Sequence, residues 1–115
     1  MSFSICVRHV GDVAVIDLVG RVVLGQGAAE SRAVINDVVT AGHKKIVVNL
    51  AAVDYIDSSG LGEFVSAYAS VSRAGGEIKL ASLQKRIYDL IQITKLNMLF
   101  ASFPDETAAI KSFKS

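Results

Sequence analysis

Two adjacent serine hydroxyls are the side chains of this sequence best placed to do chemistry, and they stand in the run Asp57-Ser58-Ser59-Gly60-Leu61-Gly62. A serine at the start of a helix accepts a hydrogen bond from an unpaired backbone amide, so the run is typical of a helix N-cap. The same position suits a phosphoserine, because free amides and the helix dipole stabilise its negative charge. The local pattern leaves both interpretations open, a structural cap and a phosphoacceptor.

The two glycines of this run fall in the expected first turn of the helix. Gly60 and Gly62 each cost about 1 kcal/mol of helix propensity relative to alanine. A capping box does not explain the pattern, because the residue three positions after Ser59 is a glycine rather than Glu or Gln. The glycines indicate that the backbone comes close to another group here, and close packing of the helix on a strand is the structural explanation.

Catalysis by one of the serines needs a base within hydrogen-bond reach. His43 precedes the strand whose far end leads to Ser58, and six strand residues at ~3.3 Å each separate the two by about 20 Å. His9 lies in the expected opening hairpin, and the run lacks the Gly-x-Ser-x-Gly elbow of hydrolases. We therefore expect no catalytic residue and a protein that is not an enzyme.

Composition narrows the class of protein further. The net charge of +1 comes with scattered Lys and Arg, so we expect no nucleic-acid partner. The single cysteine, Cys6, cannot form an internal disulfide, and no His, Cys and acid cluster has metal-ligand spacing. No apolar run approaches the ~18 residues that span a bilayer, and residues 1–8 lack a signal-peptide pattern. We expect a cytoplasmic protein without metal, cofactor or direct membrane insertion.

The elements that must position the serines follow from hydrophobic periodicity. β-branched and apolar runs predict strands over residues 5–10, 13–19, 46–50, 78–81 and 99–102, the first two joined by Gly11-Asp12 and the second broken by Gly20. Three- and four-residue spacings predict helices over 28–41, 61–74, 84–93 and 104–111. The sequence therefore predicts an α/β fold: a mixed sheet of four to five strands, opened by an N-terminal hairpin, with about four helices packed on it.

The expected inward faces of two helices follow from the same spacing. In the first helix, the predicted face comprises Ala29, Ala33, Val34, Asp37 and Val38. In the second, the apolar stripe comprises Leu61, Phe64, Val65, Tyr68 and Val71. We expect Phe64, Val65, Tyr68 and, in the third helix, Ile87 to contribute to stability rather than recognition.

The run from Tyr55 to Gly62 resembles the signature of the STAS domain in bacterial anti-sigma-factor antagonists. The resemblance extends to residues 45–50, 75–80 and 87–96, and implies one STAS domain over residues 1–115. In this family, the serine directly after the aspartate is phosphorylated by an anti-sigma factor with serine kinase activity. That implies phosphorylation at Ser58, with Ser59 as the alternative acceptor. The unphosphorylated form binds the anti-sigma factor and frees sigma, and a PPM-type phosphatase resets the switch.

The resemblance also implies a partner-binding surface. It comprises Asp57, Ser58, Ser59, Gly60 and Leu61, together with Asp54 and Tyr55 in the loop expected before the helix. Asp57 either orients Ser58 or its attacking partner, or is an acid favoured by the helix dipole. One segment departs from the best-studied sporulation members of the family. They carry an acidic residue after the glycine and usually an Asp two further on, where this chain has Arg21 and Val23. The identity of the partner is therefore open.

STAS domains also serve in other roles, and one of these is the alternative function. Such domains act as scaffold subunits of stress-signalling assemblies and as accessories of ABC-type lipid transporters or of anion transporters. The matched serine at Ser58 favours the partner switch over these roles. The sequence leaves the formation of a homo-oligomer open.

Overall fold

Five β-branched segments of this chain pair into one mixed sheet, in a computed structural model that describes residues 3–113. The strands are β1 (Ser4–Val10), β2 (Val13–Val22), β3 (Lys45–Ile56), β4 (Glu77–Ala81) and β5 (Ser102–Phe103), and they lie in this order across the sheet. β1 and β2 are antiparallel, and the other neighbours are parallel. The predicted opening hairpin is confirmed: Val10 pairs with Val13, and Gly11 takes the positive φ of 60° that its turn requires.

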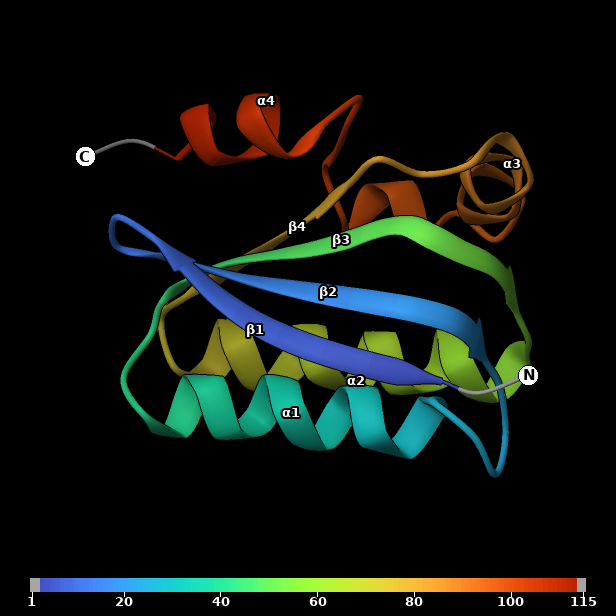
Figure 1. Cartoon of the computed structure of the whole chain (residues 1–115), viewed down its shortest axis with the longest axis horizontal. Helices are drawn as coiled ribbons and strands as arrows, with labels where there is room; N and C mark the ends of the chain where they lie inside the picture. The colour runs from blue at the N-terminus through green and yellow to red at the C-terminus, as the bar shows by residue number, and fades with distance from the viewer. Residues whose placement is uncertain (1–2, 114–115) are drawn as a thin grey trace.

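Within residues 3–113, four α-helices cover the sheet, as Figure 1 shows. They are α1 (Ala28–Thr40), α2 (Ser58–Arg73), α3 (Lys85–Ile93) and α4 (Glu106–Lys111), with a short 3₁₀ turn, η1 (Leu96–Met98), after α3. α1 and α2 lie side by side on one face, and α4 lies on the other. α3 lies at the end of the sheet where β3 runs past β4. The predicted fold class, a mixed sheet opened by a hairpin with about four helices, is confirmed.

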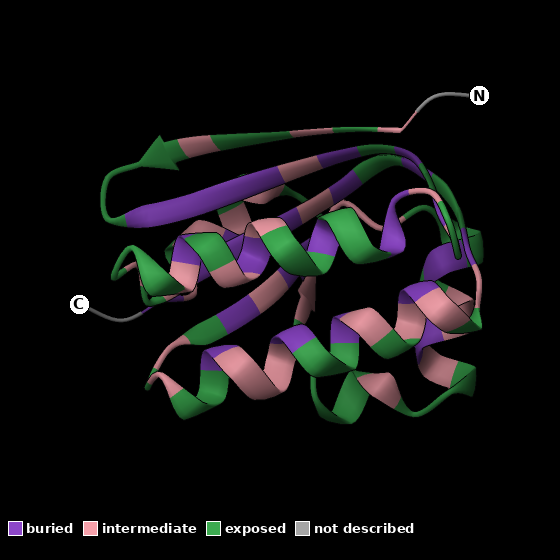
Figure 2. Ribbon diagram, turned by 90° about the horizontal axis from the view of Figure 1, so that it is seen from below, coloured by how far each residue is buried: buried purple, intermediate pink, exposed green. Residues whose placement is uncertain are grey.

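Alternation along the central strands places apolar side chains on both faces of the sheet. Ala14, Ile16 and Leu18 of β2 pack with Ile46, Val48 and Leu50 of β3 against the side of α1 and α2. Val13, Val15 and Val47 pack against the side of α4. Figure 2 shows this burial along β2, whereas the edge strand β1 is largely exposed. Strands buried on both faces are what a parallel sheet flanked by helices requires.

Two strands run further than the sequence pattern predicts. β2 continues through Gly20 to Val22, and β3 continues past Leu50 to Ile56. Irregularities in the β2–β3 register keep the extension paired and leave Val53 and Ile56 buried. The prediction of a loop before α2 was therefore wrong, because pairing with β2 holds residues 51–56 in a strand.

Helix faces and the last strand also differ in detail from the predictions. α1 buries Ala28, Ser31, Ile35 and Val38, a face rotated from the predicted one, so that Ala29, Ala33 and Asp37 are exposed. α2 buries Phe64, Ala67 and Val71, and Val65 is 37% exposed because it lies about 100° round the helix from Phe64. The last strand follows η1 and occupies Ser102–Phe103 instead of residues 99–102.

Candidate functional site

The first turn of α2 is built around the side chain of Asp57. Asp57 has extended backbone angles (φ −93°, ψ −176°), and its Oδ1 accepts a hydrogen bond from the Gly60 amide at 2.8 Å. Asp57 is therefore the N-cap, and the interpretation of a serine as the cap was wrong. Ser58 becomes the first helical residue; its side chain is exposed and makes no hydrogen bond to any residue within 3–113. Its hydroxyl is thereby left available to another molecule.

Asp57 also connects the start of α2 to the segment that follows β2 through hydrogen bonds. Its Oδ2 accepts a hydrogen bond from the Leu24 amide at 3.0 Å, and its own amide donates to the Val22 carbonyl at 3.3 Å. The amides of Leu24 and Gly60 hold the pKa of Asp57 below its ordinary value, because they stabilise the carboxylate. Asp57 is thus a charged group at neutral pH, oriented by two segments of the chain.

Gly60 shows why a glycine is required in this turn. It is buried, and a Cβ at its position would lie 2.3 Å from the Val22 carbonyl oxygen and 2.8 Å from Cγ2 of Ile56. The expected close packing of helix on strand therefore holds at Gly60. It does not hold at Gly62, where a Cβ would meet nothing within 4 Å.

A groove lies beside Ser58, between the N-terminal ends of α1 and α2. Its volume is about 540 Å³, and its walls include Leu24, Ser59, Gly62 and Glu63. Glu63 is held in place by an ion pair with Arg32 of α1 at 3.1 Å. Ser59 is half-buried in this groove, whereas Ser58 is exposed on its own side of the turn. Leu24 is 77% exposed although it is a large apolar side chain.

The remaining predicted site residues lie on β3 and just inside α2. Asp54 and Tyr55 are exposed residues of β3, not of a loop, and the Arg21 guanidinium lies 4.9 Å from the centre of the Tyr55 ring. Leu61 is half-buried and packs against the core.

Sequence reasoning did not count Leu24 and Arg21 among the partner-binding residues, although the departure from the family at Arg21 and Val23 marked this segment. The signal for Leu24 was a large apolar residue that ends the run Val22-Val23-Leu24, directly before Gly25.

Comparison with known proteins identifies the family to which this site belongs. The model of the STAS domain family matches residues 4–109. The chain belongs to the STAS domain family. Among its relatives, the anti-sigma-B factor antagonist of Bacillus subtilis is 45% identical over 47 residues, 41% of this chain and 43% of that protein. The chain therefore aligns with less than half of the length of that relative.

Two Thermotoga proteins are similar to this STAS domain over longer stretches. A Thermotoga neapolitana protein, described as an anti-sigma factor antagonist homolog, is 31% identical over 78 residues, 68% of this chain and 69% of that protein. The crystal structure of a Thermotoga maritima protein described as an anti-sigma factor antagonist has a TM-score of 0.86 at 23% identity. It covers 93% of this chain and 92% of that one, so the fold is shared.

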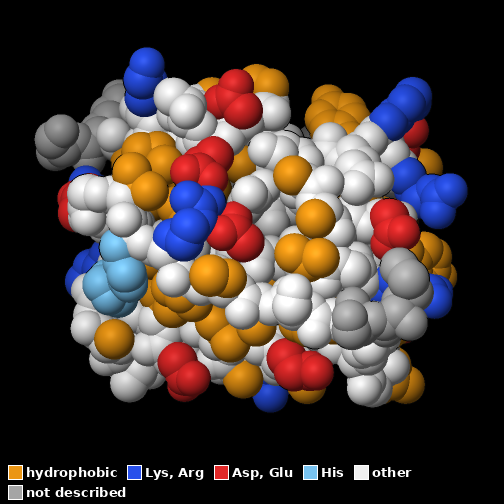
Figure 3. All heavy atoms as spheres, viewed as in Figure 1, with side chains coloured by type: hydrophobic (Ala, Val, Ile, Leu, Met, Phe, Trp, Pro, Cys, Tyr) orange, Lys and Arg blue, Asp and Glu red, His pale blue; other side chains and the backbone are white. Residues whose placement is uncertain are grey.

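The histidines of this STAS domain lie far from Ser58. The rings of His9 and His43 have their centres 4.7 Å apart. Figure 3 has the same orientation as Figure 1, and its pale blue histidine side chains lie near the turn of the β1–β2 hairpin. The full length of β3 separates them from Ser58, more than about 30 Å at ~3.3 Å per residue.

Two other properties concern metals and membranes. Within residues 3–113, no group of three His, Cys, Asp or Glu side chains is arranged to hold a metal ion. None of the helices in the same residues is long and apolar enough to cross a membrane.

Proposed function

We propose that this STAS domain is an anti-sigma-factor antagonist that works by partner switching, with Ser58 as its phosphoacceptor. The observation that carries the proposal is the exposed Ser58 side chain. Because Asp57 is the N-cap of α2, the Ser58 hydroxyl does not cap the helix. The domain acts in the cytoplasm by binding, not by catalysis. In its unphosphorylated form it binds an anti-sigma factor with serine kinase activity, and a PPM-type phosphatase restores that form after phosphorylation. The names of its relatives support the antagonist role.

The different exposure of the two serines favours Ser58 over Ser59 as acceptor. A kinase must bring the hydroxyl oxygen in line with the γ-phosphate of ATP, so the acceptor must be reachable from solvent. Ser58 is exposed, whereas Ser59 is half-buried in the groove beside Leu24. Phosphorylation of Ser58 therefore needs no rearrangement of the helix start.

Phosphorylation is expected to act on the partner interface rather than on the fold. A phosphoserine adds about −1.5 to −2 charges at neutral pH. At Ser58 this charge lies beside the Asp57 carboxylate, which already accepts the hydrogen bond of the Gly60 amide. The core packing of α2 involves Phe64, Ala67 and Val71, and not Ser58.

The added charge is sufficient for a switch. Like charge placed wrongly at an interface costs several kcal/mol. About 4 kcal/mol corresponds to a thousandfold loss of affinity.

A comparison of four baits in lysate of the source organism tests this function. We expect the wild-type protein and Ser58→Ala to retain an ATPase related to histidine kinases, identified by mass spectrometry, and Ser58→Asp to lose it. Ser72→Asp is the matched control, because it adds the same charge at an exposed position near the other end of α2, and it should retain the ATPase. Retention of the same transporter ATPase or large scaffold by wild type and Ser58→Asp alike would contradict the proposal and favour the accessory role. Circular dichroism of each bait establishes that the fold is intact.

A further inference from the structure

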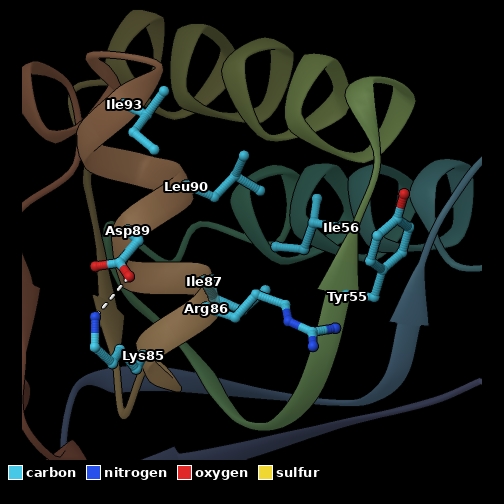
Figure 4. Close-up of a pocket in the computed structure, with 8 residues that line it drawn as sticks. All are labelled: Tyr55, Ile56, Lys85, Arg86, Ile87, Asp89, Leu90 and Ile93. Atoms are coloured by element: carbon cyan, nitrogen blue, oxygen red, sulfur yellow. Dashed lines mark hydrogen bonds and ion pairs between the residues drawn. The ribbon is translucent and has the colours of Figure 1, made fainter.

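A second pocket, separate from the groove between α1 and α2, opens between the end of β3 and α3. Figure 4 shows the residues that line it. Its volume is about 560 Å³, within the range of small-molecule sites, roughly 300–1,000 Å³. Apolar side chains form most of its wall: Ile56 from β3, and Ile87, Leu90 and Ile93 from α3. Ile87 is fully buried, whereas Ile93 is 78% exposed. The wall thus runs from the protein core to an apolar side chain that faces water.

The charges at the mouth of this pocket do not cancel. Lys85 and Asp89 form an ion pair at 2.8 Å and neutralise each other. Arg86 makes no ion pair or hydrogen bond with any residue within 3–113. Figure 4 shows its side chain extending from α3 toward β3, on the side of Tyr55. A second guanidinium, that of Arg21, lies on the Tyr55 ring. The pocket therefore combines an apolar wall with a guanidinium that no carboxylate of the described residues satisfies.

We propose that this pocket binds a small amphipathic carboxylate, taken up from solution as a single molecule. An arginine guanidinium pairs with a carboxylate through two parallel hydrogen bonds. The guanidinium of Arg86 at the mouth of the pocket is available to hold the carboxylate of the ligand in this way. The apolar body of the ligand lies on Leu90 and Ile93 and removes their surface from water. An apolar lining with few polar groups is what small-ligand sites share. The proposal stands on these residues alone and does not depend on phosphorylation of Ser58.

The pocket is joined to the start of α2 through one side chain. Ile56 lines the pocket, and its Cγ2 lies beneath Gly60, where an added Cβ would come within 2.8 Å of it. Ile56 also directly precedes Asp57 in the chain. A ligand that displaces Ile56 therefore changes the surroundings of the first turn of α2. We expect the Gly60 amide signal to move when the pocket is filled.

Titration with decanoate below its micelle concentration, followed by two-dimensional amide NMR, tests the proposal. We expect saturable shifts at Tyr55, Ile56 and residues 85–93. Arg86→Gln should weaken binding about tenfold or more, since hydrogen bonds to charged groups are among the strong ones. Arg73→Gln is the matched control, because Arg73 is an exposed arginine at the last turn of α2, and it should bind as wild type. Ile93→Ser removes exposed apolar wall without disturbing the core, and it too should weaken binding.

Two further probes separate recognition of the headgroup from adhesion to apolar surface. Decanol and decylammonium carry the same chain without the negative charge, and both should bind more weakly than decanoate. Equal binding of decylammonium, the absence of saturable shifts, or wild-type affinity in folded Arg86→Gln would overturn the proposal. Shifts of the same strength at the exposed Leu24 and Met98 would also overturn it, because they would show unspecific apolar attachment. If decanoate did not bind and an acidic peptide that contains leucine did, the proposal would be overturned, and the occupant of the pocket would be a polypeptide.

Discussion

The carboxylate of Asp57 accepts a hydrogen bond from the backbone amide of Leu24, 33 residues earlier in the chain, at 3.0 Å. Its other oxygen caps α2 through the amide of Gly60 at 2.8 Å. One side chain thus fixes both the helix that presents Ser58 and the segment that presents an exposed leucine. The surface proposed for the partner is therefore preorganised by Asp57, which is itself expected to belong to that surface.

Asp57→Asn should lower the melting temperature by a few degrees at neutral pH, because the amide side chain keeps one acceptor but loses the charge and the second acceptor, which the amides of Gly60 and Leu24 both need. The pKa of Asp57 is depressed in the folded state, so its contribution is present above the ordinary value of 3.8 and is lost as pH falls through the folded pKa. The difference in melting temperature between wild type and variant should therefore shrink in acid. Thermal unfolding measured across this pH range checks the expectation. Asp54→Asn, a change at an exposed carboxylate of β3, should have no such effect.

Gly60→Ala and Gly62→Ala form a matched pair two residues apart. At Gly60 the added Cβ meets the Val22 carbonyl oxygen at 2.3 Å, and overpacking of this kind costs about 1–3 kcal/mol of unfolding free energy. At Gly62 the Cβ meets nothing within 4 Å, so alanine should stabilise the helix by up to about 1 kcal/mol. Denaturant unfolding of both variants measures the two signs. If both variants lost stability, the first turn of α2 would need glycine for its backbone conformation, and not because of close contact with β2.

The sequence alone was sufficient for the hairpin and for the presence of each helix, because these depend on local signals. Gly11 supplies the positive φ of its turn, and the apolar spacing marks the helices. The N-cap was not decidable locally, since Asp57 and the two serines after it have similar capping preference. The amide of Leu24, in the segment that follows β2, donates to Asp57 and so completes the arrangement at the cap.

The extension of β3 and the buried face of α1 were decided by tertiary contacts. Ala51, Ala52 and Asp54 have low strand propensity, so the local pattern ends the strand at Leu50, but pairing with β2 continues it. In α1, the small side chains of Ala28, Ala29 and Ala33 fit either of two helix faces. Packing of Ile35 and Val38 into the core selects the observed one.

An ion-pair network holds α4 to the β1–β2 hairpin and should contribute modestly to stability. Arg8 donates to Asp17 at 3.0 Å and also pairs with Glu106, and Asn49 donates to Asp17 at 2.8 Å. These side chains are partly exposed, so we expect Arg8→Gln to cost about 0.5–1 kcal/mol after solvent screening. The loss should diminish in high salt.

Urea unfolding of Arg8→Gln at low and high ionic strength measures the contribution of the network. The exposed pair of Lys85 and Asp89 provides the control, and Lys85→Gln should leave the unfolding midpoint unchanged. The Arg8 guanidinium also lowers the pKa of Asp17, so the stabilisation of this network should be lost as pH falls through the depressed pKa of Asp17. A cost for Arg8→Gln that is the same at every salt concentration and pH would indicate lost packing of the arginine stem instead.

Leu24→Ala should separate recognition from stability, if the groove beside Ser58 is the partner surface. Leu24 is 77% exposed, so its truncation should leave the melting temperature unchanged. Binding of the anti-sigma factor should fall at least about tenfold, because exposed apolar anchors that become buried carry much of the energy of an interface. Met98→Ala is the matched control, since Met98 is 79% exposed and lies on η1. Equal losses of affinity in the two variants, measured by calorimetry, would move the partner surface away from the start of α2.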